Sequence, residues 1–318
     1  MRHSRGKRKF RPEGRLEDMA SRFDPFAPRD WKLAHGRSLT LGPQAIVMAI
    51  VNVTPDSFSD GGLFVSVEAA LDASLRMIGD GAQIVDIGGE STRPGATPVS
   101  AATEQERVLP LIEALARRSD VLISVDTYRA ETARLAIAAG AHIVNDVWGF
   151  QRDPEIARAT FEADAGAVIM HTGRERQRDE DVIADQHGFL DRSLSVARAA
   201  GLADERLVLD PGFGFAKTAD ENLDLMARFG ELHAFELPLL AGTSRKRFVG
   251  ALSGRDEPEA RDAATAATSV ILRMAGAAIF RVHDVAINRD ALAVADAMVA
   301  RLCRRKTESE RCPSTRST

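Results

Sequence analysis

The stretch ETARLAIAAGAHIV, residues 131–144, holds a helical segment, a glycine and a buried strand in that order. Alanine-rich sequence reaches Ala139, and Gly140 suits the left-handed position that ends a helix. The pair Ile143-Val144 suits a strand that is buried on both faces. The same order, with a glycine–alanine pair just before an apolar run, recurs at 81–85, 166–170 and 276–280. Such repeats predict parallel strands joined by crossover helices.

Eight apolar runs of this kind are spread along the chain, at 46–51, 84–87, 122–125, 143–144, 167–170, 207–209, 238–241 and 278–282. Helices are expected between and after them, including 67–78, 104–117, 181–200, 259–274 and 287–302. Eight such units in 318 residues predict an α/β fold, a (β/α)8 TIM barrel. A doubly wound open sheet is the alternative, but no Gly-x-Gly-x-x-Gly sequence follows the first strand.

This fold divides the chain into three parts. Residues 46–302 form the barrel, residues 1–45 a basic, mobile N-terminal extension and barrel cap, and residues 303–318 a polar C-terminal tail. The first fifteen residues are rich in arginine and lysine but lack the apolar stretch of a secretory signal. A solvated basic tail is preferred there over a targeting or nucleic-acid role, because such tails are common.

Composition limits the possible partners and location. With 44% apolar residues the chain can bury a sizeable core. The formal net charge of −4 gives no overall reason to expect nucleic acid or an anionic membrane as a partner. No run of about 18 apolar residues, the length that would span a bilayer, occurs. The only cysteines, Cys303 and Cys312, lie near the end, which favours a reducing, cytoplasmic location.

Polar side chains follow nearly every expected strand, and the carboxyl ends of barrel strands are where such folds carry their chemistry. One group contains cations and an amide that the first, second and eighth strands would bring together: Asn52, Arg93, Arg281 and His283. These types indicate an anion site, and phosphate is the usual occupant at that end of a barrel. A second group combines acceptors and donors that suit a flat heterocycle: Asp126, Asn145, Asp210 and Lys246.

Several residues in these loops also have structural interpretations. Any of the strand-end aspartates can simply cap the next helix. His171 is either a satisfied histidine at the barrel mouth or a ligand contact, whereas His142 starts a strand and is read as structural. Phe213 and Phe215 are either packing residues or aromatic contacts to a ligand. The convergence of eight strands, rather than one residue, supports a functional site.

Six segments in this order resemble the dihydropteroate synthase family: 52–62, 88–95, 124–127, 210–215, 244–246 and 281–284. The resemblance implies a pterin-binding TIM barrel, usually a homodimer, with a biosynthetic role in the cytoplasm. The implied reaction condenses 6-hydroxymethyl-7,8-dihydropterin pyrophosphate with p-aminobenzoate to give 7,8-dihydropteroate and pyrophosphate.

The resemblance also implies residue roles. The pterin ring would be bound by Asp126, Asn145, Asp210 and Lys246. Pyrophosphate would be held by Asn52, Arg93, Arg281 and His283, with Mg²⁺ on Asn52 and pyrophosphate oxygens. The p-aminobenzoate pocket would be lined by Phe58, Thr92, Pro94, Phe215, Lys246 and Arg247. The residues expected to act in catalysis are Lys246, Asp126, Arg93 and Thr92.

The chemistry of this reaction agrees with these residue types. A dihydropterin ring can stabilise positive charge on the methylene carbon that pyrophosphate leaves, so an S_N1-like reaction is expected. The enzyme then needs to neutralise the leaving group more than it needs a base. The attacking aromatic amine is neutral at pH 7, and no Ser-His-Asp set or cysteine nucleophile is evident. Closure of the first two loops would keep water from the cation.

Two segments depart from the family pattern. After His171 the chain reads Thr-Gly-Arg-Glu-Arg at 172–176, where many members have a second methionine and a Gly-x-Pro turn, so the contacts of this loop stay open. Arg247 follows Lys246 where a serine is common. We expect Arg247 either to supply positive charge near the p-aminobenzoate carboxylate or to point into solvent.

Two other functions compete with this interpretation. A methyltetrahydrofolate-binding methyltransferase shares the pterin-binding barrel but should not need the segments 89–95 and 244–246. A non-catalytic pterin-binding or RNA-binding protein could use the basic N-terminus, but the intact anion group argues against it. Release of pyrophosphate that depends on both substrates would separate these functions.

Overall fold

The computed structural model describes residues 23–53, 62–91 and 97–311, with side chains at all of these except 62–66 and 306–311. Eight parallel strands form one sheet: β3 (Ile46–Asn52), β4 (Ile84–Gly88), β5 (Leu122–Asp126), β6 (Ile143–Asp146), β7 (Gly166–Met170), β8 (Leu207–Asp210), β9 (Leu240–Ala241) and β10 (Ile279–Val282). Their order is β8-β7-β6-β5-β4-β3-β10-β9. A bridge between Leu209 and Leu239 joins the two edges, so the sheet closes into a barrel.

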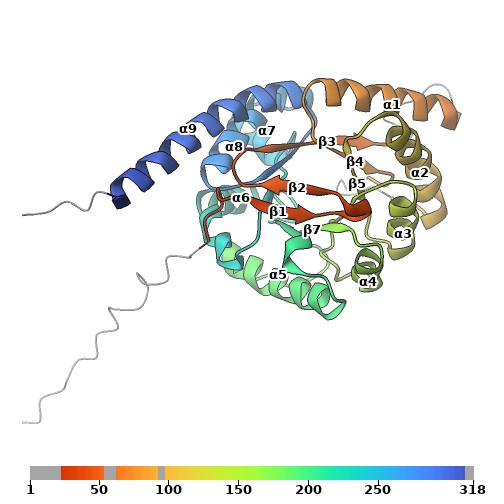
Figure 1. Ribbon diagram of the computed structural model, residues 1–318, viewed down its shortest axis with the longest axis horizontal. Coiled ribbons are helices and arrows are strands. Elements are labelled where there is room, and N and C mark those ends of the chain that lie inside the picture. Colours follow the sequence, from red (N-terminus) through yellow and green to blue (C-terminus); the bar gives the residue numbers. More distant parts are fainter. Residues whose placement is uncertain (1–22, 54–61, 92–96, 312–318) are drawn as a thin grey trace, which may run out of the picture.

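Helices surround this barrel (Figure 1). They are α1 (Gly62–Gly79), α2 (Ala101–Arg118), α3 (Ala130–Ala138), α4 (Glu155–Glu162), α5 (Val182–Ala199), α6 (Ala219–Ala227), α7 (Arg247–Ser253), α8 (Asp262–Met274) and α9 (Val285–Arg311). The predicted (β/α)8 barrel is therefore confirmed. Strand β9 is shorter than expected, because Pro238 has no N–H to donate to a neighbouring strand.

The barrel interior changes from apolar to polar along five of the eight strands, β4, β5, β6, β8 and β10. Near the N-terminal ends the inward side chains form a buried apolar cluster, which includes Met48, Ile84, Leu122, Ile143, Val168, Val208, Leu240 and Ile279. Because side chains of a strand alternate between its two faces, the next inward position lies two residues later. At those positions stand Asp86, Ser124, Asn145, Asp210 and Arg281. The strands thus carry charged groups toward their C-terminal ends.

A hairpin of β1 (Arg29–Lys32) and β2 (Ser38–Leu41) covers the N-terminal end of the barrel. Trp31 and Leu41 pack into the inner apolar cluster. The Trp31 indole N–H donates to the carbonyl of Arg206, just before β8, at 2.8 Å. The described part of the predicted N-terminal cap therefore closes the barrel at the end opposite the charged groups. Residues 1–22 lie outside the described part of the chain.

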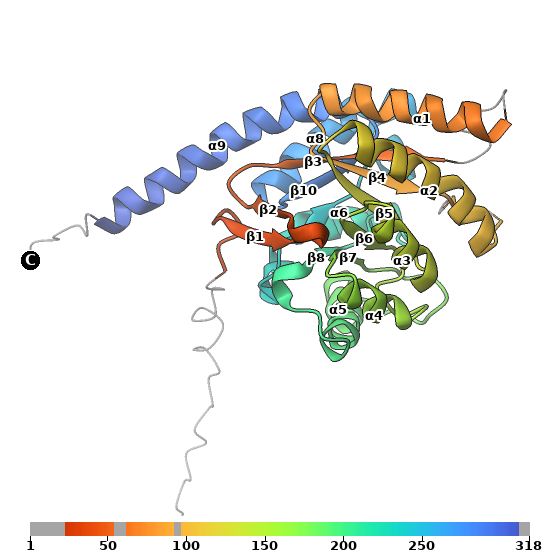
Figure 2. The same ribbon diagram turned by 45° about the vertical axis from the view of Figure 1, so that its right-hand side comes forward.

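The last helix, α9, extends beyond the barrel (Figures 1 and 2). The sequence prediction ended this helix at Leu302 and assigned residues 303–318 to a polar tail, but the helix continues to Arg311. This boundary was wrong because the polar sequence after Leu302 consists largely of good helix formers and has no glycine or proline before Pro313. Within the described ranges no helix is both long and apolar enough to cross a bilayer.

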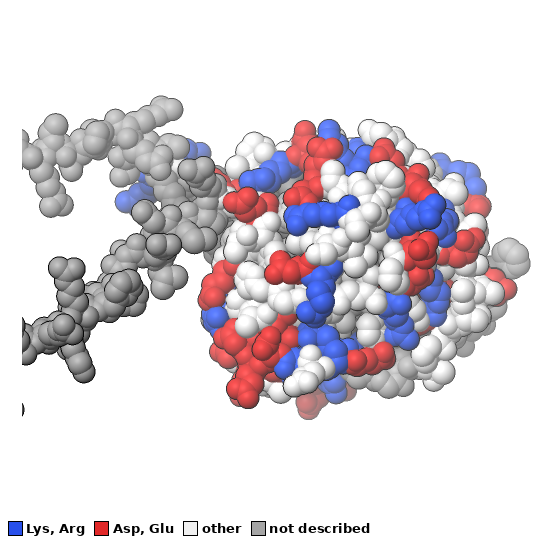
Figure 3. Space-filling model, turned by 90° about the horizontal axis from the view of Figure 1, so that it is seen from below, with Lys and Arg blue, Asp and Glu red and all other residues white. Residues whose placement is uncertain are grey.

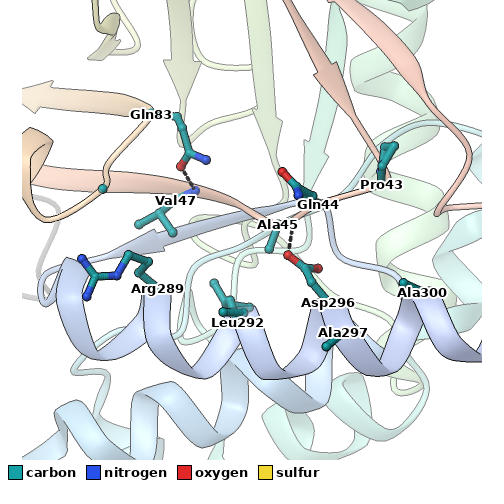
Figure 4. Close-up of a pocket in the computed structure, with 12 residues that line it drawn as sticks. Pro43, Gln44, Ala45, Val47, Gln83, Arg289, Leu292, Asp296, Ala297 and Ala300 are labelled. Carbon is teal, nitrogen blue, oxygen red and sulfur yellow. Dashed lines mark hydrogen bonds between the residues drawn. The ribbon is translucent and has the colours of Figure 1, made fainter.

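A cavity of about 440 Å³ lies between the N-terminal end of β3 and α9 (Figure 4). The Asp296 carboxylate there accepts from the Ala45 N–H at 2.9 Å, and the Gln83 side-chain oxygen accepts from the Val47 N–H at 2.8 Å. These polar groups already hold the start of β3. The cavity is also at the wrong end of the barrel for the polar strand-end residues.

Candidate functional site

Arg281 on β10 links carboxylates that come from two other strands. Its Nε lies 2.6 Å from Oδ2 of Asp86 on β4, and its Nη2 lies 2.8 Å from Oδ2 of Asp126 on β5. The Asn145 side-chain amide on β6 donates to the same Asp86 oxygen at 3.1 Å. Four strands are therefore connected by charge-assisted hydrogen bonds inside the barrel.

Strand register leaves open space next to this network. Gly88 lies opposite Asn52 on one side and Asp126 on the other. A Cβ placed on Gly88 would lie 3.6 Å from the Asn52 Oδ1 and 3.4 Å from the Asp126 Cβ. Because Gly88 has no side chain, the Asn52 amide and the Asp126 side chain border one small space above the main chain of Gly88.

Asp210 and Lys246 form the opposite side of the site. Asp210 ends β8, and its Oδ1 accepts the Gly212 N–H at 2.7 Å. Lys246 precedes α7, and its Nζ donates to the carbonyl of Phe213 and lies 4.4 Å from the Phe215 ring centroid. Gly214, with φ +77°, is required here, because a Cβ would lie 2.8 Å from the Lys246 Cδ.

Burial shifts the pKa values of these groups toward their neutral forms. Burial raises the pKa of Asp126 to about 7, although Arg281 opposes this shift. Burial likewise raises the pKa of Asp210, against the effect of Lys246. Burial lowers the pKa of Lys246 to about 7, although Asp210 favours its charged form. Carboxyl and amino groups poised near neutrality in a dry pocket are typical of a ligand site.

His283 lies just beyond Arg281 and is oriented by Ser244. Its Nδ1 is 2.9 Å from the Ser244 Oγ, and its backbone N–H donates to the same Oγ at 3.1 Å. This hydroxyl fixes the ring at the end of β10, next to β3.

The comparisons with known proteins agree with this geometry. The profile of the family described as "Pterin binding enzyme" matches residues 48–283. The dihydropteroate synthase of Streptococcus pyogenes is 46% identical over 251 residues, which are 79% of this chain and 94% of that protein. The Bacillus subtilis dihydropteroate synthase is 45% identical over 248 residues, 78% of this chain and 86% of that protein. This chain belongs to the dihydropteroate synthase family.

Solved structures of the family have the same fold. The Xanthomonas albilineans dihydropteroate synthase with 4-aminobenzoic acid is 44% identical and superimposes with a TM-score of 0.80, covering 85% of this chain and 99% of that one. A structure of the same enzyme holds 7,8-dihydropteroate, with 42% identity, a TM-score of 0.77 and coverage of 85% and 99%. The chain is accordingly a transferase with a role in folate biosynthesis.

The structure brings together the four residues that the sequence assigned to the pterin ring. Lys246 lies close enough to Asp210 and Asp126 for both charges to raise its pKa, and Asn145 shares Asp86 with Arg281. Arg281 itself was assigned to the pyrophosphate group, but here it is paired with carboxylates. The two predicted groups are therefore parts of one charged network.

The remaining predicted residues differ in how much the structure says of them. Phe58, Thr92, Arg93 and Pro94 lie outside the described residues. Arg247 is the exposed first residue of α7. The alternatives for the two phenylalanines are resolved: Phe213 is fully buried and stacks on Phe229 and Phe248, whereas Phe215 is partly exposed beside Lys246.

His171 is a fully buried member of a second polar network. Its Nδ1 lies 2.9 Å from the Lys217 Nζ, and its Nε2 lies 3.0 Å from the Asp185 Oδ2. A charged lysine only donates, so Nδ1 accepts from Lys217. Lys217 also donates to the carbonyls of Pro211 and Gly212, at 3.0 and 2.9 Å. The satisfied-histidine interpretation is therefore favoured, and His171 supports the loop after Asp210.

Sequence reasoning missed three residues of these networks, Asp86, Lys217 and Asp185. Asp86 stands inside the apolar run of β4, where a single carboxylate between apolar residues was a usable signal for an interior charge. Lys217 stands seven residues beyond Asp210 in a loop, and only the folded loop brings its amino group back to the strand ends.

The buried His171 should make the protein lose stability in acid. Burial, followed by the nearby charge of Lys217, lowers the pKa of His171 to about 3, against 6.5 for the free side chain. Between these values the unfolded chain binds more protons than the folded one, so the free energy of unfolding falls as the pH falls. From pH 7 to pH 5 this one group should cost about 2 kcal/mol.

We therefore predict that His171→Gln flattens the pH dependence by about that amount. The measurement is urea unfolding of both proteins at pH 7, 6 and 5. If the free energy of unfolding depends on pH in the same way in the variant and the parent protein, His171 is not held in its neutral form.

Proposed function

We propose that this chain condenses 6-hydroxymethyl-7,8-dihydropterin pyrophosphate with p-aminobenzoate, forming 7,8-dihydropteroate and pyrophosphate. The observation that carries the proposal is the convergence of the buried Asp126, Asn145 and Asp210 with the half-buried Lys246 at the strand ends. The reaction is tested by pyrophosphate release, which should require both substrates. Steady-state release without p-aminobenzoate, or no release with both substrates, would contradict the proposal.

The pterin ring offers N–H donors on one edge and acceptor atoms on another. Asp126 and Asp210 would accept N–H groups, Asn145 can do both, and Lys246 would donate to a ring nitrogen or oxygen. Burial supports this assignment because a hydrogen bond to a charged group is worth more where water cannot compete.

In the reaction the bond from the methylene carbon to the pyrophosphate oxygen breaks, and pyrophosphate leaves with the electron pair. The pterin ring stabilises the cation, and the amine nitrogen then attacks the carbon and loses a proton. This order is S_N1-like and needs charge neutralisation on the leaving group. Asn52, Arg281 and His283 come from adjacent strands and supply that function, with Arg93 as a further donor.

We also propose Mg²⁺ as the cofactor, with the Asn52 amide oxygen as its protein ligand. Magnesium is commonly bound through one or two protein oxygens together with substrate phosphates. Within the described ranges there is no group of three or more His, Cys, Asp or Glu that could hold a metal, so pyrophosphate would supply most ligands. When bound, the ion would neutralise charge on the leaving group.

Four residues would act directly in catalysis: Lys246, Asp126, Arg93 and Thr92. Lys246 and Asp126 would keep their contacts with the pterin ring while the ring takes up positive charge. Arg93 and Thr92 would act on the pyrophosphate and the second substrate. Phe58, Pro94, Phe215 and Arg247 would complete the p-aminobenzoate pocket.

The proposal includes a cytoplasmic homodimer that binds only small molecules. Exposed apolar side chains follow one stripe of α9, namely Ile287, Val294, Met298 and Leu302, and Ile271 is exposed on the adjacent α8. A contiguous apolar surface of this kind suits a protein interface. On the face drawn in Figure 3, acidic and basic side chains are interspersed, so that face supports no nucleic-acid footprint. The two cysteines in the chain support a reducing compartment.

Two substitutions in the pocket should remove activity without unfolding the barrel. Asp210→Asn and Lys246→Ala each remove a charged group that is proposed to bind the pterin ring, so kcat/KM should fall by about 100-fold or more. Steady-state kinetics give the effect, and a thermal melt checks the fold. Asp220→Asn, at an exposed carboxylate on α6, is the matched control. Near-normal kcat/KM in both pocket variants would remove these residues from the site.

The dimer is tested on the α9 stripe. Val294 is 66% exposed and Met298 51% exposed, so Val294→Glu with Met298→Glu should leave the fold intact and place two carboxylates in the interface. We expect sedimentation to give twice the chain mass for the parent protein and the chain mass for this variant. Leu223→Glu, on α6, should remain dimeric. A dimer unaffected by the double substitution would place the interface elsewhere.

A further inference from the structure

Arg174 is brought into the site by the loop whose sequence departs from the family pattern. Its guanidinium carbon lies 4.6 Å from the centroid of the Phe215 ring, and the Lys246 Nζ lies 4.4 Å from the same centroid. Two cations from different loops therefore share one aromatic side chain. The ring faces attract cations, which explains how both are tolerated there.

The loop that carries Arg174 is fastened on both sides. Arg176 makes two contacts with Asp185 on α5, Nη1 to Oδ1 and Nη2 to Oδ2, both at 2.7 Å. Arg178 pairs with Glu221 on α6 at 2.9 Å. Burial disfavours the charged form of Asp185, but the hydrogen bonds from His171 and Arg176 outweigh it and hold the pKa well below its usual range. Arg174 is thus presented by a rigid support, which reduces the entropy lost when a ligand binds.

Arg174 and Lys246 place two basic side chains at the Phe215 ring. Burial is the main cause of the lowered pKa of Lys246, and the charge of Arg174 adds to it. The Lys246 ammonium already donates to the Phe213 carbonyl and lies beside Asp210. Arg174 is half-buried at the same ring, and burial also lowers its pKa.

We propose that Arg174 is a specificity-determining residue for the second substrate, and that its guanidinium binds the carboxylate of p-aminobenzoate. The inference rests on the proposed function, in which Phe215 and Lys246 line the p-aminobenzoate pocket. A guanidinium matches a carboxylate with two parallel N–H groups. The sequence had offered Arg247 for this role, but Arg247 is exposed at the start of the short helix α7. Arg174 is the half-buried arginine that shares the Phe215 ring with Lys246.

The test compares p-aminobenzoate with p-aminobenzamide, which has the same amine and ring but no charge. Arg174→Gln should raise KM for p-aminobenzoate about tenfold and leave KM for the amide within about twofold, because only the acid loses a charged partner. Arg174→Lys should retain part of the preference for p-aminobenzoate over the amide, since lysine keeps the charge but lacks the paired N–H groups. Arg192→Gln, at an exposed position on α5, is the matched control and should change neither KM.

The outcomes separate the inference from the proposed function. If the parent enzyme does not release pyrophosphate with both substrates, the proposed function fails. If it does, but Arg174→Gln raises KM for acid and amide equally, Arg174 has only a structural role and the inference is overturned. The inference is also overturned if the ratio of KM for the acid to KM for the amide is the same in Arg174→Gln as in the parent enzyme. A loss of the preference for the acid in Arg247→Gln, and not in Arg174→Gln, would overturn it too.

Discussion

The Arg281 guanidinium, held between Asp86 and Asp126 inside the barrel, is the interaction on which the rest of the site depends. Burying one such cation or carboxylate alone would cost several kcal/mol, on the order estimated for isolated ions in proteins. The three groups are stable only together, and Asn145 adds a further hydrogen bond to Asp86. Four strands are consequently fixed in register at the end of the barrel where substrates would arrive.

The alternation of side chains along the strands builds this network from a simple pattern. On five of the eight strands an inward apolar residue is followed two positions later by a polar one, as Ile279 is by Arg281 on β10. The apolar layer and the β1–β2 hairpin seal one end, which leaves the polar layer facing the other. A single rule of strand geometry therefore separates the part of the barrel that provides stability from the part that binds.

Much of this was predictable from the sequence, because helix–glycine–strand repeats and polar strand ends are local signals. Asp126, Asn145 and Asp210 were placed at the strand ends from their sequence positions alone. Asp86 was missed because it lies within an apolar run. The partners of Arg281 could not be predicted, because side-chain rotamers and contacts between strands do not follow from the neighbouring sequence. The position of Arg174 depends on how its loop is fastened to α5 and α6, which only the folded chain reveals. Helix α9 was shortened because a polar sequence was equated with a tail.

The proposed function requires Arg281, which pairs with Asp86 and Asp126 in the structure, to contact the bound pyrophosphate. The most direct measurement is a crystal structure of the full chain with pterin pyrophosphate and Mg²⁺ bound, in the absence of p-aminobenzoate. The account predicts the pterin ring between Asp126, Asn145, Asp210 and Lys246, with the Arg281 guanidinium in contact with a pyrophosphate oxygen. A structure in which Arg281 keeps both carboxylates and the pyrophosphate lies away from β10 would contradict it.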